Sequence, residues 1–126
     1  MRTLTVVVVE DDPDMREMLS ETLVQEGYAV ETFDCGEAAL RRLRSGSWPH
    51  VLVVDDILPG MSGGELLEAV RDEAEQAGTA ILCITGMLGR SAPGPGVLPK
   101  PFSVGELLER IGSGPRLEAE ASPPPL

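Results

Sequence analysis

Two runs of apolar residues in this sequence each end abruptly on carboxylates. Residues 6–9 are four valines that lead into Glu-Asp-Asp at 10–12, and residues 51–54 (Val-Leu-Val-Val) lead into Asp55 and Asp56. A strand that is apolar at every position is buried on both faces, which is typical of a parallel sheet covered by helices. Ligand sites of such sheets lie beyond the carboxyl ends of the strands, so we expect both sets of acids to meet at one site.

Strand and helix patterns alternate along the chain, which predicts an α/β fold with a doubly wound parallel sheet of about five strands. Asp12 and Pro13 predict a helix start, while Ser62 with Glu65 and Ser103 with Glu106 form two capping boxes. The expected strands are residues 6–9, 29–33, 51–54, 80–84 and 97–98. The expected helices run from Pro13 to before Gly27, over 36–43, from Ser62 to before Gly78, and from Ser103 through 111.

One helix of this alternation is not expected. The segment 86–96 between the last two strands contains four glycines and two prolines, which are incompatible with a regular helix. Eleven extended residues can span about 36 Å, more than the roughly 17 Å needed to reach the start of a neighbouring strand. We therefore predict that the fourth helix is shortened or absent. The segment would be disordered or would cover the sheet with Met87 and Leu88, and the weaker cover would favour a partner or a second copy.

Length and composition restrict the possible functions. The 126 residues suit one domain, expected over 1–112, followed by a flexible Pro-rich tail or linker at 113–126. The formal net charge of −11 argues against direct nucleic-acid binding. The sequence shows neither a signal peptide nor a stretch of apolar residues long enough for a membrane span, so we expect a cytoplasmic protein. Cys35 and Cys83 fit no metal-binding spacing and are expected to be reduced packing residues.

Five residues at the predicted strand ends form a possible reaction centre: Glu10, Asp11, Asp55, Thr85 and Lys100. The three acids bring a charge of −3, which a divalent cation and the lysine would balance. Few hard oxygen ligands with room for water favour Mg²⁺. A carboxylate beside Mg²⁺ and an ammonium group can attack a phosphoryl group, and a hydroxyl can hydrogen-bond to the acyl phosphate that forms.

These residues lie in motifs that resemble the receiver domain of bacterial response regulators. The similarity covers most of residues 4–111 and includes Val-Val-Val-Glu-Asp-Asp-Pro ending at Pro13, Val-Val-Asp-Asp-Ile-Leu-Pro-Gly-Met-Ser-Gly ending at Gly63, Ile-Thr-Gly ending at Gly86, and Lys-Pro-Phe ending at Phe102. The resemblance implies a flavodoxin-like sheet with strand order 2-1-3-4-5. It also implies a two-component phosphorelay function, not an enzyme beyond its own phosphorylation and slow dephosphorylation.

The resemblance also assigns roles to the candidate residues. Asp55 would be the phosphoacceptor, and Glu10 and Asp11 would hold Mg²⁺ together with Asp55 and the backbone carbonyl of Ile57. Thr85 would be the switch hydroxyl and Lys100 the phosphoryl partner, with a cis peptide bond before Pro101. The phosphodonor would be a sensor histidine kinase or a phosphotransfer protein, and the output would be an unidentified protein partner or a homodimer.

Four further expectations follow from individual positions. Asp12 is interpreted as the helix N-cap, and Asp56 is displaced by one residue from the strand-end position. Receivers usually carry an aromatic residue three positions before the lysine, where this chain has Val97, so the output mechanism is expected to differ. Ile57 and Met87 flank the site and would orient an attacking water poorly, which predicts a long-lived acyl phosphate.

Two other functions remain open from the sequence. The first is a pseudo-receiver that uses the same fold as a protein-interaction module without phosphorylation. The second is an aspartyl-nucleophile phosphatase, because Asp12-Pro13-Asp14 is superficially similar to the DxD motif of the haloacid dehalogenase superfamily. Arg16 stands where that superfamily would have Thr or Val, and the chain has no room for a cap domain. A flavin-binding site is disfavoured because the first loop is acidic.

Overall fold

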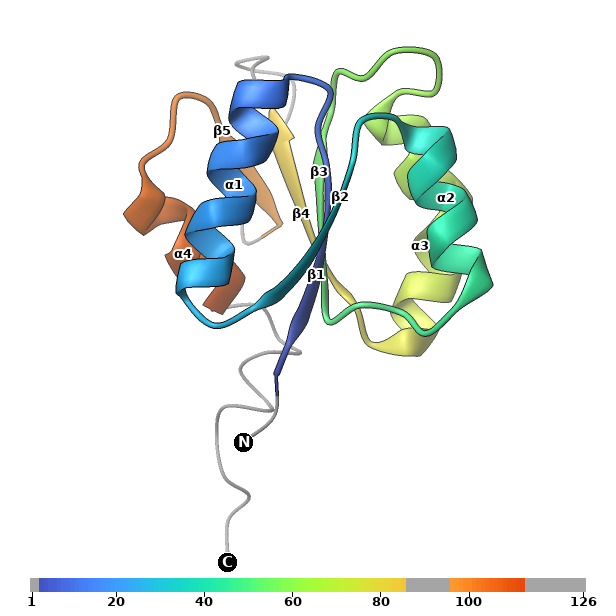
Figure 1. Ribbon diagram of the computed structural model, residues 1–126. Coiled ribbons are helices and arrows are strands. Elements are labelled where there is room, and N and C mark those ends of the chain that lie inside the picture. Colours follow the sequence, from blue (N-terminus) through green and yellow to red (C-terminus); the bar gives the residue numbers. More distant parts are fainter. Residues whose placement is uncertain (1–2, 86–95, 113–126) are drawn as a thin grey trace, which may run out of the picture.

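A computed structural model describes residues 3–85 and 96–112 of the chain. Its five parallel strands form one sheet in the order β2-β1-β3-β4-β5 (Figure 1), which confirms the predicted fold class and strand order. The elements in chain order are β1 (Thr5–Val9), α1 (Pro13–Gln25), β2 (Ala29–Phe33), α2 (Gly36–Ser45), β3 (Val51–Asp55), α3 (Gly63–Ala77), β4 (Ala80–Thr85), β5 (Val97–Pro99) and α4 (Val104–Gly112).

The neighbouring strands β1 and β3 are buried on both faces, as their unbroken apolar sequences predict. On one face Val6 and Val8 of β1 pack with residues of α1 and α4, including Leu19 and Leu107. On the other face Val7 and Val9 pack with residues of α2 and α3, including Leu43 and Leu66. Figure 1 shows α1 and α4 on one side of the sheet and α2 and α3 on the other. This double burial fixes the sheet, so the loops that follow its strands are held on a rigid base.

The helix starts follow the predicted capping residues. Asp12 accepts a hydrogen bond from the N–H of Asp14, so it is the N-cap of α1. Both capping boxes form, because Ser62 and Glu65 exchange two hydrogen bonds and Ser103 and Glu106 do the same. Each box satisfies N–H groups that a helix leaves without partners in its first turn. The strand β3 extends one residue beyond its prediction and ends on Asp55 itself.

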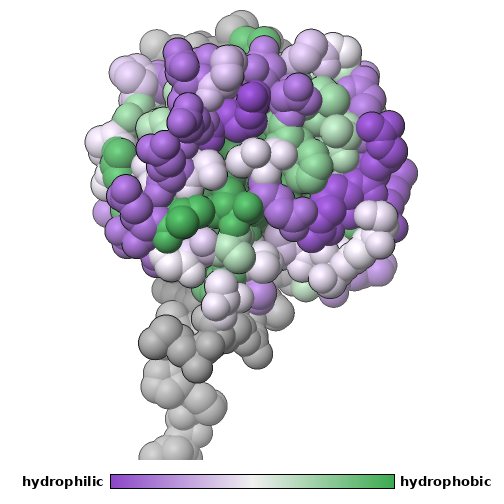
Figure 2. Space-filling view, viewed as in Figure 1, coloured by the Kyte–Doolittle hydropathy of each residue, from purple (hydrophilic) through white to green (hydrophobic). Residues whose placement is uncertain are grey.

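Two predictions concern parts of the chain outside the described residues. These are the absence of a helix between β4 and β5, together with the placement of Met87 and Leu88, and the flexible tail at 113–126. Within residues 3–85 and 96–112 the chain contains four helices. None of the helices in these ranges is both long enough and apolar enough to cross a membrane. Hydrophilic residues gather over the outer surfaces of α1 and α2, with smaller apolar patches between them (Figure 2).

Candidate functional site

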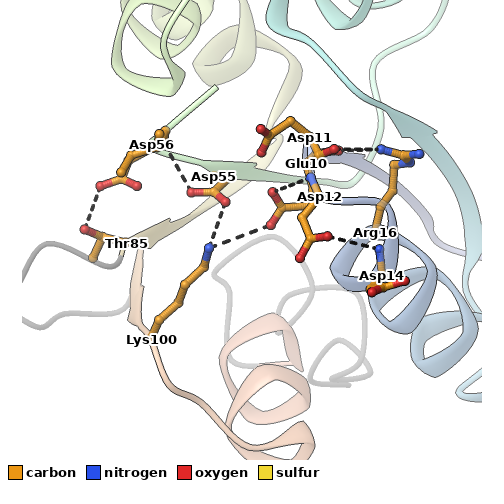
Figure 3. A network of polar contacts seen from close by, with 10 residues as sticks. Glu10, Asp11, Asp12, Asp14, Arg16, Asp55, Asp56, Thr85 and Lys100 are labelled. Carbon is orange, nitrogen blue, oxygen red and sulfur yellow. Dashed lines mark hydrogen bonds and ion pairs between the residues drawn. The ribbon is translucent and has the colours of Figure 1, made fainter. Parts of the chain in front are cut away.

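The sheet brings all five candidate residues to its carboxyl edge. Glu10 and Asp11 follow β1, Asp55 ends β3, Thr85 ends β4 and Lys100 follows β5. The strand register places Val9 beside Val54, and therefore the acids that follow these valines lie next to one another. Figure 3 shows the side chains of Glu10, Asp55 and Lys100 directed at a common centre.

Lys100 joins the two buried acids of the site. Its Nζ donates a hydrogen bond of 2.9 Å to Oδ2 of Asp55 and lies 3.8 Å from Oε1 of Glu10. The backbone N–H of Lys100 also donates to the carbonyl of Thr85 at 2.7 Å, which anchors the lysine to the end of β4. The peptide bond between Lys100 and Pro101 is cis, as predicted. The backbone hydrogen bond to Thr85 thus anchors Lys100 where its side chain reaches the acids.

Three carboxylates form a cluster with the composition of a divalent-cation site. One oxygen from each of Glu10, Asp11 and Asp55 lies within 4.8 Å of the other two. Glu10 and Asp55 are buried, with relative exposures of 1% and 4%, whereas Asp11 is exposed. Oε1 of Glu10 is buried and has no hydrogen-bond partner in the described part of the chain. An orphaned buried carboxylate oxygen beside two further hard oxygen donors fits a Mg²⁺ ion.

The pKa values of the two buried acids, Glu10 and Asp55, are shifted in opposite directions. Burial first, and then the adjacent Asp55 carboxylate, raise the pKa of Glu10 to about 8. Burial would also raise the pKa of Asp55, but the neighbouring Glu10 carboxyl group and the hydrogen bond from Lys100 outweigh burial and lower that pKa below its ordinary value. In the metal-free protein these opposite pKa shifts favour a proton on Glu10 and an ionised carboxylate on Asp55. An ionised carboxylate is the form that can act as a nucleophile.

The loop after β1 is held in place by backbone contacts. Nη1 of Arg16, on the first turns of α1, donates to the carbonyl oxygens of Glu10 at 3.0 Å and of Asp11 at 3.4 Å. The N–H of Asp12 donates to Oε2 of Glu10 at 3.3 Å. The exposed side chain of Asp12 caps α1, which does not support its role as the nucleophile of a phosphatase. Arg16 was not among the candidate residues, because a single arginine on a helix carries no sequence signal for a loop contact.

Gly63 allows α3 to begin directly against the end of β3. A Cβ atom added at Gly63 would lie 2.1 Å from the carbonyl oxygen of Asp55 and 2.8 Å from Cα of Asp56. Only a residue without a side chain tolerates such a close backbone approach. A side chain of α2 holds the turn that precedes Gly63: Oε2 of Glu37 accepts a hydrogen bond of 3.2 Å from the N–H of Met61. These contacts hold the segment that follows Asp55 against the end of β3.

Ile57 follows Asp55 by two positions and is 60% exposed. Its N–H donates to Oδ1 of Asp55 at 3.2 Å. Both oxygens of Asp55 therefore have a donor, one from the backbone of Ile57 and one from Lys100. The apolar side chain of Ile57 offers no hydrogen bond to a water near Asp55.

The Thr85 hydroxyl contacts an acid that the sequence interpretation had set aside. Oγ1 of Thr85 donates a hydrogen bond of 2.7 Å to Oδ2 of Asp56, and Figure 3 shows the side chain directed at Asp56. The strand register explains this contact, because Asp55 lies beside Ile84 and the following residues are therefore neighbours across the two strands. The predicted parallel pairing of these strands did not fix their register, so the sequence carried no signal for this contact.

Comparison with known proteins identifies relatives over nearly the whole described chain. Residues 6–112 match the model of the response regulator receiver domain. A protein of Mycobacterium tuberculosis named "Probable transcriptional regulatory protein TcrX" is 35% identical over 115 residues, which cover 86% of this chain and 48% of that protein. The phosphate regulon transcriptional regulatory protein PhoB of Rhizobium meliloti is 32% identical over 113 residues, which cover 84% of this chain and 49% of that protein. The chain thus spans about half the length of these curated relatives.

Solved structures include close matches to the fold. The chemotaxis protein CheY4 of Vibrio cholerae superimposes with a TM-score of 0.75 at 31% sequence identity. That match covers 87% of this chain and 97% of CheY4.

Proposed function

Since the chain belongs to the response regulator receiver domain family, we propose that it accepts a phosphoryl group on Asp55 from a histidine kinase or a phosphotransfer protein. Receiver domains of two-component systems interact with histidine kinases, and this chain is such a receiver domain. The observation that carries the proposal is the state of Asp55, a buried carboxylate whose pKa is lowered despite its burial and whose Oδ2 lies 2.9 Å from Nζ of Lys100.

In the proposed reaction, a carboxylate oxygen of Asp55 attacks the phosphorus of a phosphohistidine. The new O–P bond forms as the P–N bond breaks, and the imidazole leaves with the electron pair of that bond and takes up a proton. Lys100 holds the attacking carboxylate and supplies positive charge next to the incoming phosphoryl oxygens. The Thr85 hydroxyl, also at this edge of the sheet, then donates to the acyl phosphate.

The proposed metal site consists of Glu10, Asp11 and Asp55 with the backbone carbonyl of Ile57. Bound Mg²⁺ would neutralise negative charge on the phosphoryl oxygens during transfer. Metal binding requires Glu10 to release the proton that burial and Asp55 retain on it. Arg16 fixes the two carbonyl groups of the acidic loop, so its part is to position Glu10 and Asp11 and not to contact the phosphoryl group.

The consequence of phosphorylation is proposed to be a change in association with a protein partner or with a second copy. We propose the cytoplasm as the compartment, which is supported by the free, half-buried thiols of Cys35 and Cys83. Burial and the nearby acids raise the pKa of the Cys83 thiol, which further favours an unreactive packing role. The net charge of −11 continues to disfavour direct contact with nucleic acid.

Incubation with acetyl phosphate and Mg²⁺, followed by intact-mass measurement, tests the proposed function. Wild-type protein should gain one phosphoryl group, and Asp55→Asn should gain none. Asp12→Asn is the matched control, because Asn also caps helices well and the side chain of Asp12 lies outside the carboxylate cluster. A folded wild-type protein that gains no phosphoryl group would instead favour a phosphorylation-independent interaction module.

A further inference from the structure

The hydroxyl of Thr85 has one proton to donate, and in this structure it is donated to Asp56. The same hydroxyl cannot at that moment donate to a phosphoryl group on Asp55. We propose that Asp56 is a positioning residue whose carboxylate competes for the Thr85 hydroxyl and thereby opposes the phosphorylated state. This inference rests on the proposed function, because it concerns the acyl phosphate at Asp55.

The contact is short and lies in a half-buried position. Oδ2 of Asp56 lies 2.7 Å from Oγ1 of Thr85, and Thr85 is only 7% exposed. A hydroxyl that donates to an ionised carboxylate forms one of the stronger hydrogen bonds in proteins. The Thr85 hydroxyl must leave Asp56 before it can reach a phosphoryl oxygen. The free energy of the lost hydrogen bond to Asp56 therefore reduces the net gain from the new hydrogen bond to the phosphoryl group.

The surroundings of Asp56 increase the cost of that exchange. Its other oxygen, Oδ1, is buried and has no hydrogen-bond partner within the described residues. Departure of the Thr85 hydroxyl would leave Oδ2 without this donor as well. Loss of a donor from a buried carboxylate is more costly than loss from one in water, because water cannot readily replace it. Asp56 therefore retains the hydroxyl more strongly than an exposed acid would.

The backbone on both sides of the contact is fixed, which limits the exchange to side-chain movement. The N–H of Asp56 donates to the carbonyl of Ile84 at 3.0 Å, and the carbonyl of Thr85 accepts from the N–H of Lys100 at 2.7 Å. Thr85 can therefore change acceptor by rotation about its Cα–Cβ bond between staggered positions. Asp56 belongs to the site for this reason, although it is not one of the three clustered carboxylates.

Affinity for beryllium fluoride in the presence of Mg²⁺, measured by isothermal titration calorimetry, tests the inference. Beryllium fluoride is a stable analogue of the phosphoryl group on a carboxylate. Asp56→Ala removes the competing acceptor and should tighten binding about tenfold. Asp56→Asn keeps the size of the side chain and offers a weaker neutral acceptor, so it should tighten binding about threefold. Thermal unfolding of each variant verifies that it is folded.

The same measurement in a Thr85→Val background separates the hydrogen bond from the charge of Asp56. If Asp56 acts through the hydroxyl, Asp56→Ala should change the affinity of Thr85→Val by less than about twofold. Equal tightening with and without the hydroxyl would overturn the inference, as would unchanged or weaker binding by either folded Asp56 single variant. These results leave the proposed function intact. Absence of binding by wild type and all Asp56 variants would contradict both the proposed function and the inference.

Discussion

Nζ of Lys100 lies 2.9 Å from Oδ2 of Asp55, and this ion pair spans 45 positions of the sequence at the carboxyl edge of the sheet. Asp55 is 4% exposed, so a second charge is needed to keep its carboxylate ionised there. The pair also places a cation where negative charge develops when Asp55 accepts a phosphoryl group.

Replacement of Lys100 by Met should slow phosphorylation by acetyl phosphate by about a hundredfold, because it removes this preorganised cation. The rate is measured from intact mass against time at fixed Mg²⁺. Arg71→Met is the control, since Arg71 forms an ion pair with Glu68 on the exposed surface of α3. An equal effect of both substitutions would show that the loss is general and not specific to the site.

Replacement of Gly63 by Ala should destabilise the protein by about 3 kcal/mol or more, because the new Cβ would collide with backbone atoms. Gly64→Ala is a matched control on the same helix, where the added Cβ would meet only Oγ of Ser62 at 3.9 Å. It should stabilise the protein by up to about 1 kcal/mol through better helix propensity. Urea unfolding measures both. Similar free energies of unfolding for the two variants would contradict the close approach of α3 to Asp55.

The metal-free protein should lose stability as the pH rises from about 4.5 to about 8, the ordinary and raised pKa values of Glu10. Between these values the folded protein retains a proton on Glu10 that the unfolded chain has released, so stability is complete below this window and falls across it. Asp55 has a lowered pKa, and its contribution changes only at pH values below its ordinary 3.8.

Urea unfolding in a chelator at several pH values measures this dependence. Glu10→Gln should flatten the curve within the window, because glutamine does not titrate. If wild type and Glu10→Gln change in parallel, Glu10 is not the group responsible.

Added Mg²⁺ should raise the thermal unfolding temperature of wild-type protein, because the ion binds the folded carboxylate cluster. Asp11→Asn should lose most of this increase, since it removes one of the three clustered carboxylates. Asp12→Asn should retain it, because Asp12 only caps α1. Differential scanning fluorimetry at a series of Mg²⁺ concentrations distinguishes the two, and an equal response from both variants would exclude Asp11 as a ligand.

Ile57→Asn should shorten the lifetime of the acyl phosphate, because an amide at this exposed position can orient a water that the apolar side chain cannot. Ile57→Leu is the control and should leave the lifetime unchanged. Decay is followed by intact mass after removal of acetyl phosphate. A wild-type half-life of seconds with Mg²⁺ present would contradict the predicted slow dephosphorylation.

Much of the fold was predictable because local sequence and global packing agree. The valines of β1 make both faces of that strand apolar. Asp12, Ser62 and Ser103 mark helix starts through hydrogen bonds between neighbouring residues. Convergence of Asp55 and Lys100 followed from a topological rule, that parallel strands end at one edge. Such features need no knowledge of side-chain conformation.

The contacts that the sequence did not indicate depend on exact position. The Thr85 hydroxyl donates to Asp56 and not to Asp55 because of the strand register and the side-chain rotamer. The closeness of Gly63 to Asp55 is decided by where α3 enters relative to β3. These distances change by ångströms with small shifts of the backbone, and no pattern of residue types encodes them.

Reduction of the acetyl-phosphate-treated protein with borohydride tests the central claim most directly. Borohydride converts an aspartyl phosphate to homoserine, and tandem mass spectrometry of the peptides locates that residue. The account predicts homoserine at position 55 only, although Asp56 is its immediate neighbour. Homoserine at position 56, 11 or 12, or at no position in a protein that has gained a phosphoryl group, would contradict the assignment of Asp55 as the phosphoacceptor.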